Sequence, residues 1–312
     1  MPPELLALAG ADLLSSADLS AAQSQGLLQL AAAIKRGESR PQLDGRVLGL
    51  IFTKASTRTR VSFTVAMARL GGQTVDLNPA VTQVGRGEPI EDTARVLSRY
   101  VDALAIRTFA QADLEHYAQA ASIPVVNALT DLEHPCQALA DYLTLQENFG
   151  QLEGLTLAYV GDGNNVAHSL LLSGALLGVN VRIGCPVGFE PAAAVLAQAR
   201  ALAGERCCLE VVADPMEAVT GAQAIYTDVW ASMGQEQEQQ DREKAFKGFC
   251  LNQELLHAAD PAAIVLHCLP AHRGEEISAE VLEGPASRVF DQAENRLHAQ
   301  QALLATLLGA NP

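Results

Sequence analysis

"RVLGLIFTKASTRTRVSF", residues 46–63, joins a short apolar run to a turn that is rich in hydroxyl groups and arginines. The run at 46–52 has the length and composition of a buried strand, and a helical pattern follows near 58–70. A strand that leads through a short turn into a helix is the unit from which parallel α/β sheets are built. The stretch therefore predicts an α/β fold.

The same alternation continues along both halves of the chain. Helical patterns separate further apolar runs in the first half, at 73–77, 101–106 and 123–128, and in the second half, at 155–161, 179–185, 207–212, 224–229 and 263–269. Continuous apolar strands that alternate with helices indicate parallel sheets covered by helices on both faces. We expect two α/β domains, each with a doubly wound parallel sheet.

The boundary between the two domains is predicted near "NFGQLEG", residues 148–154, where glycines precede the second series of strands. This gives domains at 1–149 and 150–312, each of an ordinary domain size. The final segment, about 292–309, has the pattern of an amphipathic helix.

The composition is that of an acidic globular protein. Hydrophobic residues make up 49% of the 312 residues and charged residues 18%, and the formal net charge is -15. This balance argues against general binding to nucleic acid or to a membrane surface. An anion would need a local basic pocket in such a chain, which makes clustered arginines informative. No stretch approaches the roughly 20 apolar residues that span a bilayer.

Two further features predict a cytoplasmic location. The first residues, "MPPELLALAGADLLSSADLS", carry acids and no basic region, so we expect neither a signal peptide nor a transit peptide. The cysteines are scattered through a chain of ordinary size, which suggests reduced thiols rather than a disulfide framework. They are Cys136, Cys185, Cys207, Cys208, Cys250 and Cys268.

The turn after the first strand is suited to bind an anion. The first amides of a helix point outward, and the helix dipole favours negative charge. Ser56, Thr57 and Thr59 add hydroxyl donors, and Arg58 offers a planar guanidinium to phosphate oxygens. An ordinary helix cap explains the same residues equally well, so their spacing alone leaves both interpretations open.

Four motifs resemble the aspartate/ornithine carbamoyltransferase family. STRTR at 56–60 is similar to the carbamoyl-phosphate motif of that family, and HPCQALAD at 134–141 is similar to its His-Pro-x-Gln-x-x-x-Asp signature. DVWASMGQE at 228–236 and HCLPAHRGEEI at 267–277 resemble the branch that uses ornithine. The motifs follow the family's order across nearly the whole chain.

The resemblance implies an activity and an architecture. The expected reaction joins carbamoyl phosphate and L-ornithine to give L-citrulline and phosphate, as part of arginine metabolism. Residues 1–149 would bind carbamoyl phosphate, residues 150–312 would bind ornithine, and the last helix would return to the first domain. Family members are usually trimers or multiples of trimers, so a homotrimer is expected, with the loop around Gln83 reaching a neighbouring subunit.

The resemblance also implies a set of residues that bind carbamoyl phosphate. Matched to the family motifs, Arg58 holds the phosphate, Arg107 binds both the phosphate and the carbamoyl oxygen, His134 polarises the carbonyl, and Cys136 packs rather than reacts. The full set is Ser56, Thr57, Arg58, Thr59, Gln83, Arg107, His134, Pro135, Cys136, Gln137, Cys268, Leu269 and Arg296. Without the motifs, Arg107 and Arg296 would be read as solvent-facing arginines and His134 as a helix cap.

The amino-acid site is expected at Asn165, Asp228, Ser232 and Met233, again by resemblance. An acidic side chain suits an ammonium group, and hydroxyl and backbone donors suit a carboxylate. The catalytic residues implied are Cys268, Arg107, His134 and Asp228. The sequence YVGDGNNVAHS at 159–169 also suggests a dinucleotide fingerprint, but it lacks the third glycine of that motif.

A metal site is the alternative for His267, Cys268 and His272, because both residue types bind zinc. Adjacent residues on a strand point to opposite faces, so His267 and Cys268 are not expected to share an ion. No second cysteine pair accompanies them at the spacing of a zinc site. We expect neither a metal nor an organic cofactor.

Several alternatives stay open at this stage. The acceptor could be aspartate, putrescine or N-acetylornithine instead of ornithine, although SMG at 232–234 disfavours putrescine. A noncatalytic module that binds phosphate or amino acids would explain the anion site but not the four candidate catalytic residues together. The sequence does not decide between the synthesis and the breakdown of arginine, and the compact length favours synthesis.

Overall fold

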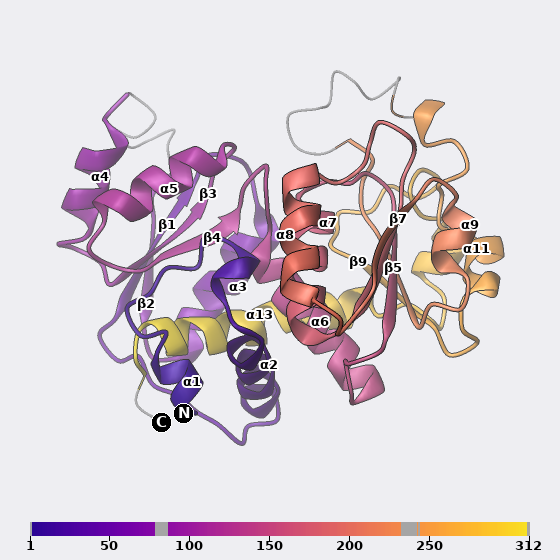
Figure 1. The fold of residues 1–312 in the computed structure, drawn as a ribbon. Coiled ribbons are helices and arrows are strands. Elements are labelled where there is room, and N and C mark those ends of the chain that lie inside the picture. Colours follow the sequence, from indigo (N-terminus) through magenta and orange to yellow (C-terminus); the bar gives the residue numbers. More distant parts are fainter. Residues whose placement is uncertain (1, 79–86, 232–241, 243, 311–312) are drawn as a thin grey trace. The chain divides into compact units, whose positions relative to one another are not determined.

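The computed structural model describes residues 2–78, 87–231, 242 and 244–310. The chain forms two compact units (Figure 1), which we call the N-terminal unit, Met1–Leu143 with Asn295–Pro312, and the C-terminal unit, Thr144–Glu294. Each unit contains one parallel sheet flanked by helices. The predicted fold class is therefore confirmed, including the return of the C-terminal residues to the first unit.

The N-terminal unit is built on four strands in the order β2-β1-β3-β4, all parallel. They are β1 (Val47–Phe52), β2 (Gln73–Asp76), β3 (Ala103–Arg107) and β4 (Val125–Leu129). Each strand begins and ends within two residues of the predicted run. Leucine and isoleucine side chains of β1 and β3 are fully buried, which explains why these runs are continuously apolar.

Helices cover both faces of this sheet. In Figure 1, α4 and α5 lie on one side and α2, α3 and α13 on the other. The helices are α1 (Pro3–Leu6), α2 (Ala21–Lys35), α3 (Thr57–Arg69), α4 (Ile90–Leu97), α5 (Gln111–Ala120), α6 (Pro135–Phe149) and α13 (Val289–Leu307), with a short 3-10 helix, η1 (Ser16–Asp18). The sequence did not predict α2, although a capping box formed by Ser20 and Gln23 marks its start.

The C-terminal unit is built on five parallel strands in the order β7-β6-β5-β8-β9. They are β5 (Thr156–Val160), β6 (Asn180–Gly184), β7 (Leu209–Val212), β8 (Ala224–Thr227) and β9 (Ile264–His267). In Figure 1, α7 and α8 lie on one side of the sheet and α9 and α11 on the other. The helices are α7 (Asn165–Leu177), α8 (Ala193–Ala203), α9 (Pro215–Val219), α11 (Gln253–Ala258) and α12 (Ala279–Leu282).

The strand ends correct two expectations. Arg107 is the last residue of β3 rather than the residue after the strand. Strand β9 ends at His267, so Cys268 already lies in the following turn and strand alternation does not apply to it. Because all strands of a sheet are parallel, their carboxyl ends meet at one edge, and the motif residues follow those ends.

None of the helices in the described ranges is long and apolar enough to cross a membrane.

Candidate active site

The turn between β1 and α3 carries the first candidate residues. Ser56 precedes α3 with an extended backbone, and in the described structure its hydroxyl makes no capping hydrogen bond to the helix. Arg58 is exposed, while Thr59 is buried. The ordinary cap therefore does not account for Ser56, whose hydroxyl is available to a ligand.

A buried chain of hydrogen bonds extends from Thr59. Arg296 donates from Nη2 to Thr59 Oγ1 at 3.1 Å and from Nη1 to Gln137 Oε1 at 2.5 Å. Gln137 in turn donates from Nε2 to Asp141 Oδ1 at 2.8 Å. The structure thus brings STRTR, HPCQALAD and α13 together within the N-terminal unit, and Arg296 is not the solvated helix arginine that its position alone suggests.

His134 lies beside this chain and precedes α6. Burial lowers the pKa of His134 well below its ordinary value, and the positive charges of Arg296, Arg107 and Arg58 lower the pKa further. These interactions link His134 to three arginines from three separate segments of the chain: the start of α3, the end of β3 and α13. A neutral imidazole in a cluster of guanidinium groups can donate a hydrogen bond to an anionic ligand without adding charge.

We predict that His134 stays neutral as the pH falls through the ordinary histidine midpoint of about 6.5. The pKa of His134 is lower in the folded state than in the unfolded chain. The contribution of neutral His134 to the free energy of unfolding is therefore fully present above the midpoint of the unfolded chain, and it is lost as the pH falls through the lower pKa of the folded state. An NMR pH titration checks this, with the His134→Gln variant identifying the signal. A normal histidine titration for that signal would contradict the prediction.

Cys136, two residues further on, is structural. Burial raises the pKa of its thiol to about 12, and its Sγ donates to the carbonyl of Asn127 at 3.4 Å. A thiol with that pKa is protonated at neutral pH and is a poor nucleophile. This agrees with the expectation that Cys136 packs rather than reacts.

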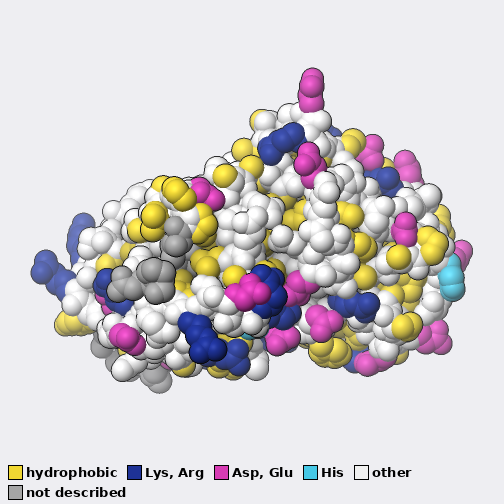
Figure 2. All heavy atoms as spheres, turned by 90° about the horizontal axis from the view of Figure 1, so that it is seen from below, with side chains coloured by type: hydrophobic (Ala, Val, Ile, Leu, Met, Phe, Trp, Pro, Cys, Tyr) yellow, Lys and Arg dark blue, Asp and Glu magenta, His cyan; other side chains and the backbone are white. Residues whose placement is uncertain are grey.

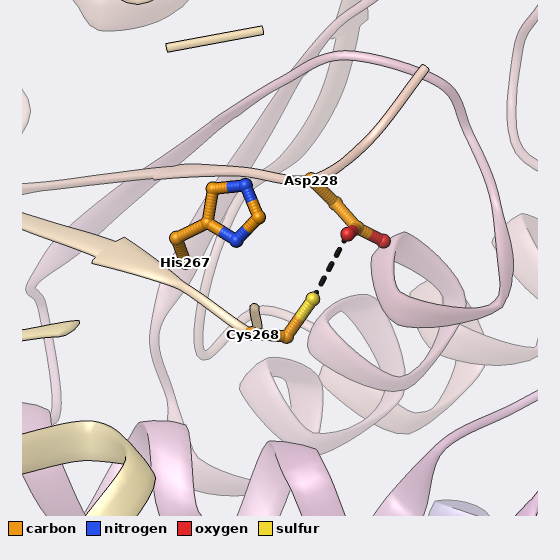
Figure 3. Close-up of side chains that lie close together, drawn as sticks. All are labelled: Asp228, His267 and Cys268. Carbon is orange, nitrogen blue, oxygen red and sulfur yellow. Dashed lines mark hydrogen bonds between the residues drawn. The ribbon is translucent and has the colours of Figure 1, made fainter. Parts of the chain in front are cut away.

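The candidate residues of the C-terminal unit gather where β5, β8 and β9 end. Asp228 follows β8 and Cys268 follows β9, and these two strands are neighbours in the sheet. The Cys268 thiol donates to Asp228 Oδ1 at 2.9 Å, as Figure 3 shows. The backbone amide of Val229 donates to the same oxygen at 2.8 Å. A thiol and a carboxylate therefore share one hydrogen bond at the carboxyl edge of the sheet.

Asn164 is a site residue that none of the sequence motifs predicted. It donates from Nδ2 to Asp228 Oδ2 at 2.9 Å, while its Oδ1 accepts from the amides of Val166 and Ala167 as the cap of α7. The predicted residue Asn165 is the first residue of that helix. An asparagine just before an apolar helical pattern is a typical N-cap, and that signal could have identified Asn164.

Two hydrogen bonds hold the His267 ring and determine which nitrogen carries the proton. Its Nδ1 accepts from the amide of Leu269 at 2.8 Å, so its Nε2 carries the proton and donates to Glu276 Oε1 at 2.9 Å. Glu276 Oε1 also accepts from the amide of His272 at 2.6 Å. His267 thus fixes the turn that contains Leu269.

Asp228, His267 and Cys268 lie close enough together to be considered as a metal site. One potential ligand atom each from Asp228, His267 and Cys268 lies within 4.8 Å of the others, so His267 and Cys268 do not point apart (Figure 3). The His267 nitrogens, however, are engaged by Leu269 and Glu276. A metal would have to displace the Leu269 amide, which disfavours this cluster as a metal site.

The remaining predicted residues divide between the two units. The structure brings Thr59, His134, Gln137 and Arg296 together in the N-terminal unit, with Arg58 and Arg107 acting on His134. Cys268 and Leu269, which are also predicted to bind carbamoyl phosphate, lie in the C-terminal unit with Asp228 and Asn165. Three predicted residues lie outside the described ranges: Gln83, Ser232 and Met233.

Comparison with known proteins matches two family models to successive parts of the chain. Residues 11–147 match the family model described as the aspartate/ornithine carbamoyltransferase carbamoyl-P binding domain, and residues 153–307 match that of the Asp/Orn binding domain. The chain is 72% identical over 302 residues to the ornithine carbamoyltransferase of Parasynechococcus marenigrum, covering 97% of this chain and 95% of the relative.

Solved structures show the same similarity. The crystal structure of ornithine carbamoyltransferase from Gloeobacter violaceus is 58% identical, with a TM-score of 0.88 over 96% of this chain and 98% of that one. The ornithine carbamoyltransferase from Pyrococcus furiosus is 50% identical, with a TM-score of 0.93 over 98% of this chain and 99% of that one.

Proposed function

Because the chain belongs to the aspartate/ornithine carbamoyltransferase family, we propose that it transfers the carbamoyl group of carbamoyl phosphate to the side-chain amine of L-ornithine. The products are L-citrulline and phosphate. The observation that carries the choice of ornithine is the hydrogen bond between Cys268 and Asp228, which unites two motifs of the ornithine branch. The names of the most similar relatives support the same acceptor.

The N-terminal unit binds the carbamoyl phosphate. Arg58, the hydroxyls of Ser56 and Thr57 and the first amides of α3 hold the phosphate, which suits charge-assisted hydrogen bonds at a helix N-terminus. Arg107 and neutral His134 bind the carbamoyl oxygen. Arg296 fixes Thr59 and Gln137 beside it.

The C-terminal unit prepares the amine. An alkyl amine such as that of ornithine titrates near about 10, so it arrives as an ammonium and must lose a proton before it can react. Asp228, 6% exposed, attracts the ammonium and accepts the proton that it loses, and the Cys268 thiol donates a hydrogen bond to the same carboxylate. Asn165 binds the amino-acid end of ornithine, together with Ser232 and Met233. The carbonyl of Leu269, whose amide is held by His267, accepts from the carbamoyl amide.

The reaction proceeds by attack of the neutral amine on the carbonyl carbon of carbamoyl phosphate. The amine lone pair attacks the carbonyl carbon, a C–N bond forms, and the carbonyl oxygen becomes an oxyanion stabilised by Thr59, Arg107 and His134. The oxyanion collapses, the C–O bond to phosphate breaks, and the bonding pair leaves with the phosphate, which takes up the amine proton. A mixed anhydride already has a good leaving group, so the proposal includes no metal and no organic cofactor.

The cellular setting is a further part of the proposal. We place the enzyme in arginine biosynthesis in the cytoplasm and as a homotrimer, with Gln83 completing the site of a neighbouring subunit. The domains are 1–149 for carbamoyl phosphate and 150–312 for ornithine. The free cysteines are compatible with a reducing compartment. Sedimentation should give a mass about three times the 33.0 kDa of one chain.

The test is citrulline formation by purified protein supplied with carbamoyl phosphate and ornithine. Parallel reactions replace ornithine with aspartate, putrescine or N-acetylornithine. We expect turnover with ornithine and little with the others, since Asp228 suits the ammonium of ornithine and would repel the second carboxylate of aspartate. Preferential turnover of another amine would overturn the choice of acceptor, and turnover of none would favour a noncatalytic binding module.

A further inference from the structure

Arg242 makes a buried ion pair that the reaction itself does not use. Its Nη1 donates to Asp162 Oδ2 at 2.6 Å and to the backbone carbonyl of Trp230 at 2.8 Å. Arg242 and Asp162 are each 7% exposed, and the Arg242 guanidinium lies over the ring of Phe189 at 5.1 Å. A desolvated guanidinium with two acceptors and an aromatic face has a defined position.

Both acceptors belong to segments that carry the proposed ornithine site. Asp162 lies in the turn between β5 and α7, and its carbonyl accepts from the amide of Asn164 at 2.7 Å. Asn164 then donates to Asp228. Trp230 is two residues beyond Asp228 in the chain. Arg242 therefore closes a ring of contacts from Asp162 through Asn164 and Asp228 to Trp230.

The residues around this ring of contacts are closely packed. Phe246 donates its amide to the carbonyl of Arg242 at 2.8 Å, and its ring packs on Trp230 and Phe189 with centroid distances of 5.7 Å and 4.9 Å. Gly163 approaches the 190–191 backbone so closely that a Cβ would lie 2.3 Å from Pro191 N. The turn that holds Asp162 and Asn164 is thus fixed from both sides.

We propose that Arg242 and Asp162 are positioning residues for the amino-acid half of the reaction. This inference rests on the proposed function. The pair sets the distance between the Asn164 turn and the segment that begins at Asp228, and so determines how well ornithine is bound. The proposed role is to position the binding groups and not to touch either substrate, and both acceptors of Arg242, Asp162 and Trp230, belong to the C-terminal unit.

The test compares KM values for the two substrates in Arg242→Met, Asp162→Asn and Arg242→Lys. We expect Arg242→Met to raise the KM for ornithine about 10- to 100-fold, the range that follows a small misplacement of binding groups. The KM for carbamoyl phosphate should stay unchanged. Asp162→Asn should also raise the KM for ornithine, and Arg242→Lys should restore part of the affinity because it keeps a cationic donor.

Arg182 provides the matched control. It also combines an ion pair, with Glu210 at 3.5 Å, and a hydrogen bond to a carbonyl, that of Thr220 at 2.8 Å, in the same unit. Arg182→Met should lower the melting temperature without changing either KM. A purely structural role for Arg242 predicts the same behaviour for Arg242→Met, and that result would overturn the inference.

The outcomes separate this inference from the proposed function. Wild-type protein that makes no citrulline would refute the function, and the inference with it. Wild-type protein that makes citrulline, with an unchanged KM for ornithine in Arg242→Met, would refute the inference alone. Should Arg242→Met fail to fold, Asp162→Asn and Arg242→Lys decide: an unchanged KM for ornithine in both refutes the inference, and a raised KM in Asp162→Asn supports it.

Discussion

Asp228→Asn is expected to lower kcat for citrulline formation about a thousandfold, within the range for loss of a general base. The replacement keeps the size of the side chain but removes the negative charge that attracts the ornithine ammonium. In the structure, Asn164 Nδ2 and the Cys268 thiol both donate to the carboxylate. The new amide replaces one acceptor oxygen with an NH2 donor, so one of these hydrogen bonds is lost. Steady-state kinetics with ornithine as the varied substrate measure the effect.

Asp214→Asn is the matched control for that change. Asp214 lies in the same unit and caps α9 by accepting from the amide of Met216 at 2.9 Å, away from Asp228 and Cys268. Its replacement should change stability slightly and leave kcat unaltered. A kcat for Asp228→Asn equal to that of Asp214→Asn would show that Asp228 has no part in the transfer.

Arg58→Met should raise the KM for carbamoyl phosphate about 100-fold, the upper range for one hydrogen bond to a charged group. Because Arg58 is exposed, its removal costs the fold little and the change reports on the ligand. Inorganic phosphate should raise the melting temperature of the wild type by mass action and that of the variant much less. Kinetics and thermal melts with phosphate provide the two measurements.

Arg69→Met controls for the loss of a positive charge on the same helix. Arg69 is the last residue of α3 and is also exposed, whereas Arg58 lies in its first turn. Only the first turn offers outward amides and the positive end of the dipole, so Arg69→Met should leave both measurements unaltered. Equal behaviour of the two variants would mean that overall charge, and not the β1–α3 turn, binds the anion.

The fold was predictable because its strands are buried on both faces. A strand covered by helices on each side reads as an unbroken apolar run, as 46–52 and 155–161 do, and such runs differ from amphipathic helices. Helix α2 was missed because its buried face includes Ser24 and Gly26 beside Leu27, Leu28 and Ala31, so the apolar residues show no clear helical period. Its capping box was the available signal.

The site was predictable only as far as the motifs extended. Asp228 and Cys268 could be named from the sequence, but the argument that separated His267 from Cys268 was wrong because β9 ends at His267. A strand end depends on where its neighbour ends, which no local pattern records. The same holds for Arg242, whose partner Asp162 lies eighty positions away in the sequence.

The central claim is that a carbamoyl group passes to the side-chain nitrogen of ornithine. The most direct measurement supplies carbamoyl phosphate labelled at its carbonyl carbon and ornithine labelled at its side-chain nitrogen, and records the NMR spectrum of the product. We predict citrulline with a one-bond coupling between the two labels, formed about a thousandfold more slowly by Asp228→Asn. Labelled carbon on the α-nitrogen, or release of the label without any coupling, would contradict it.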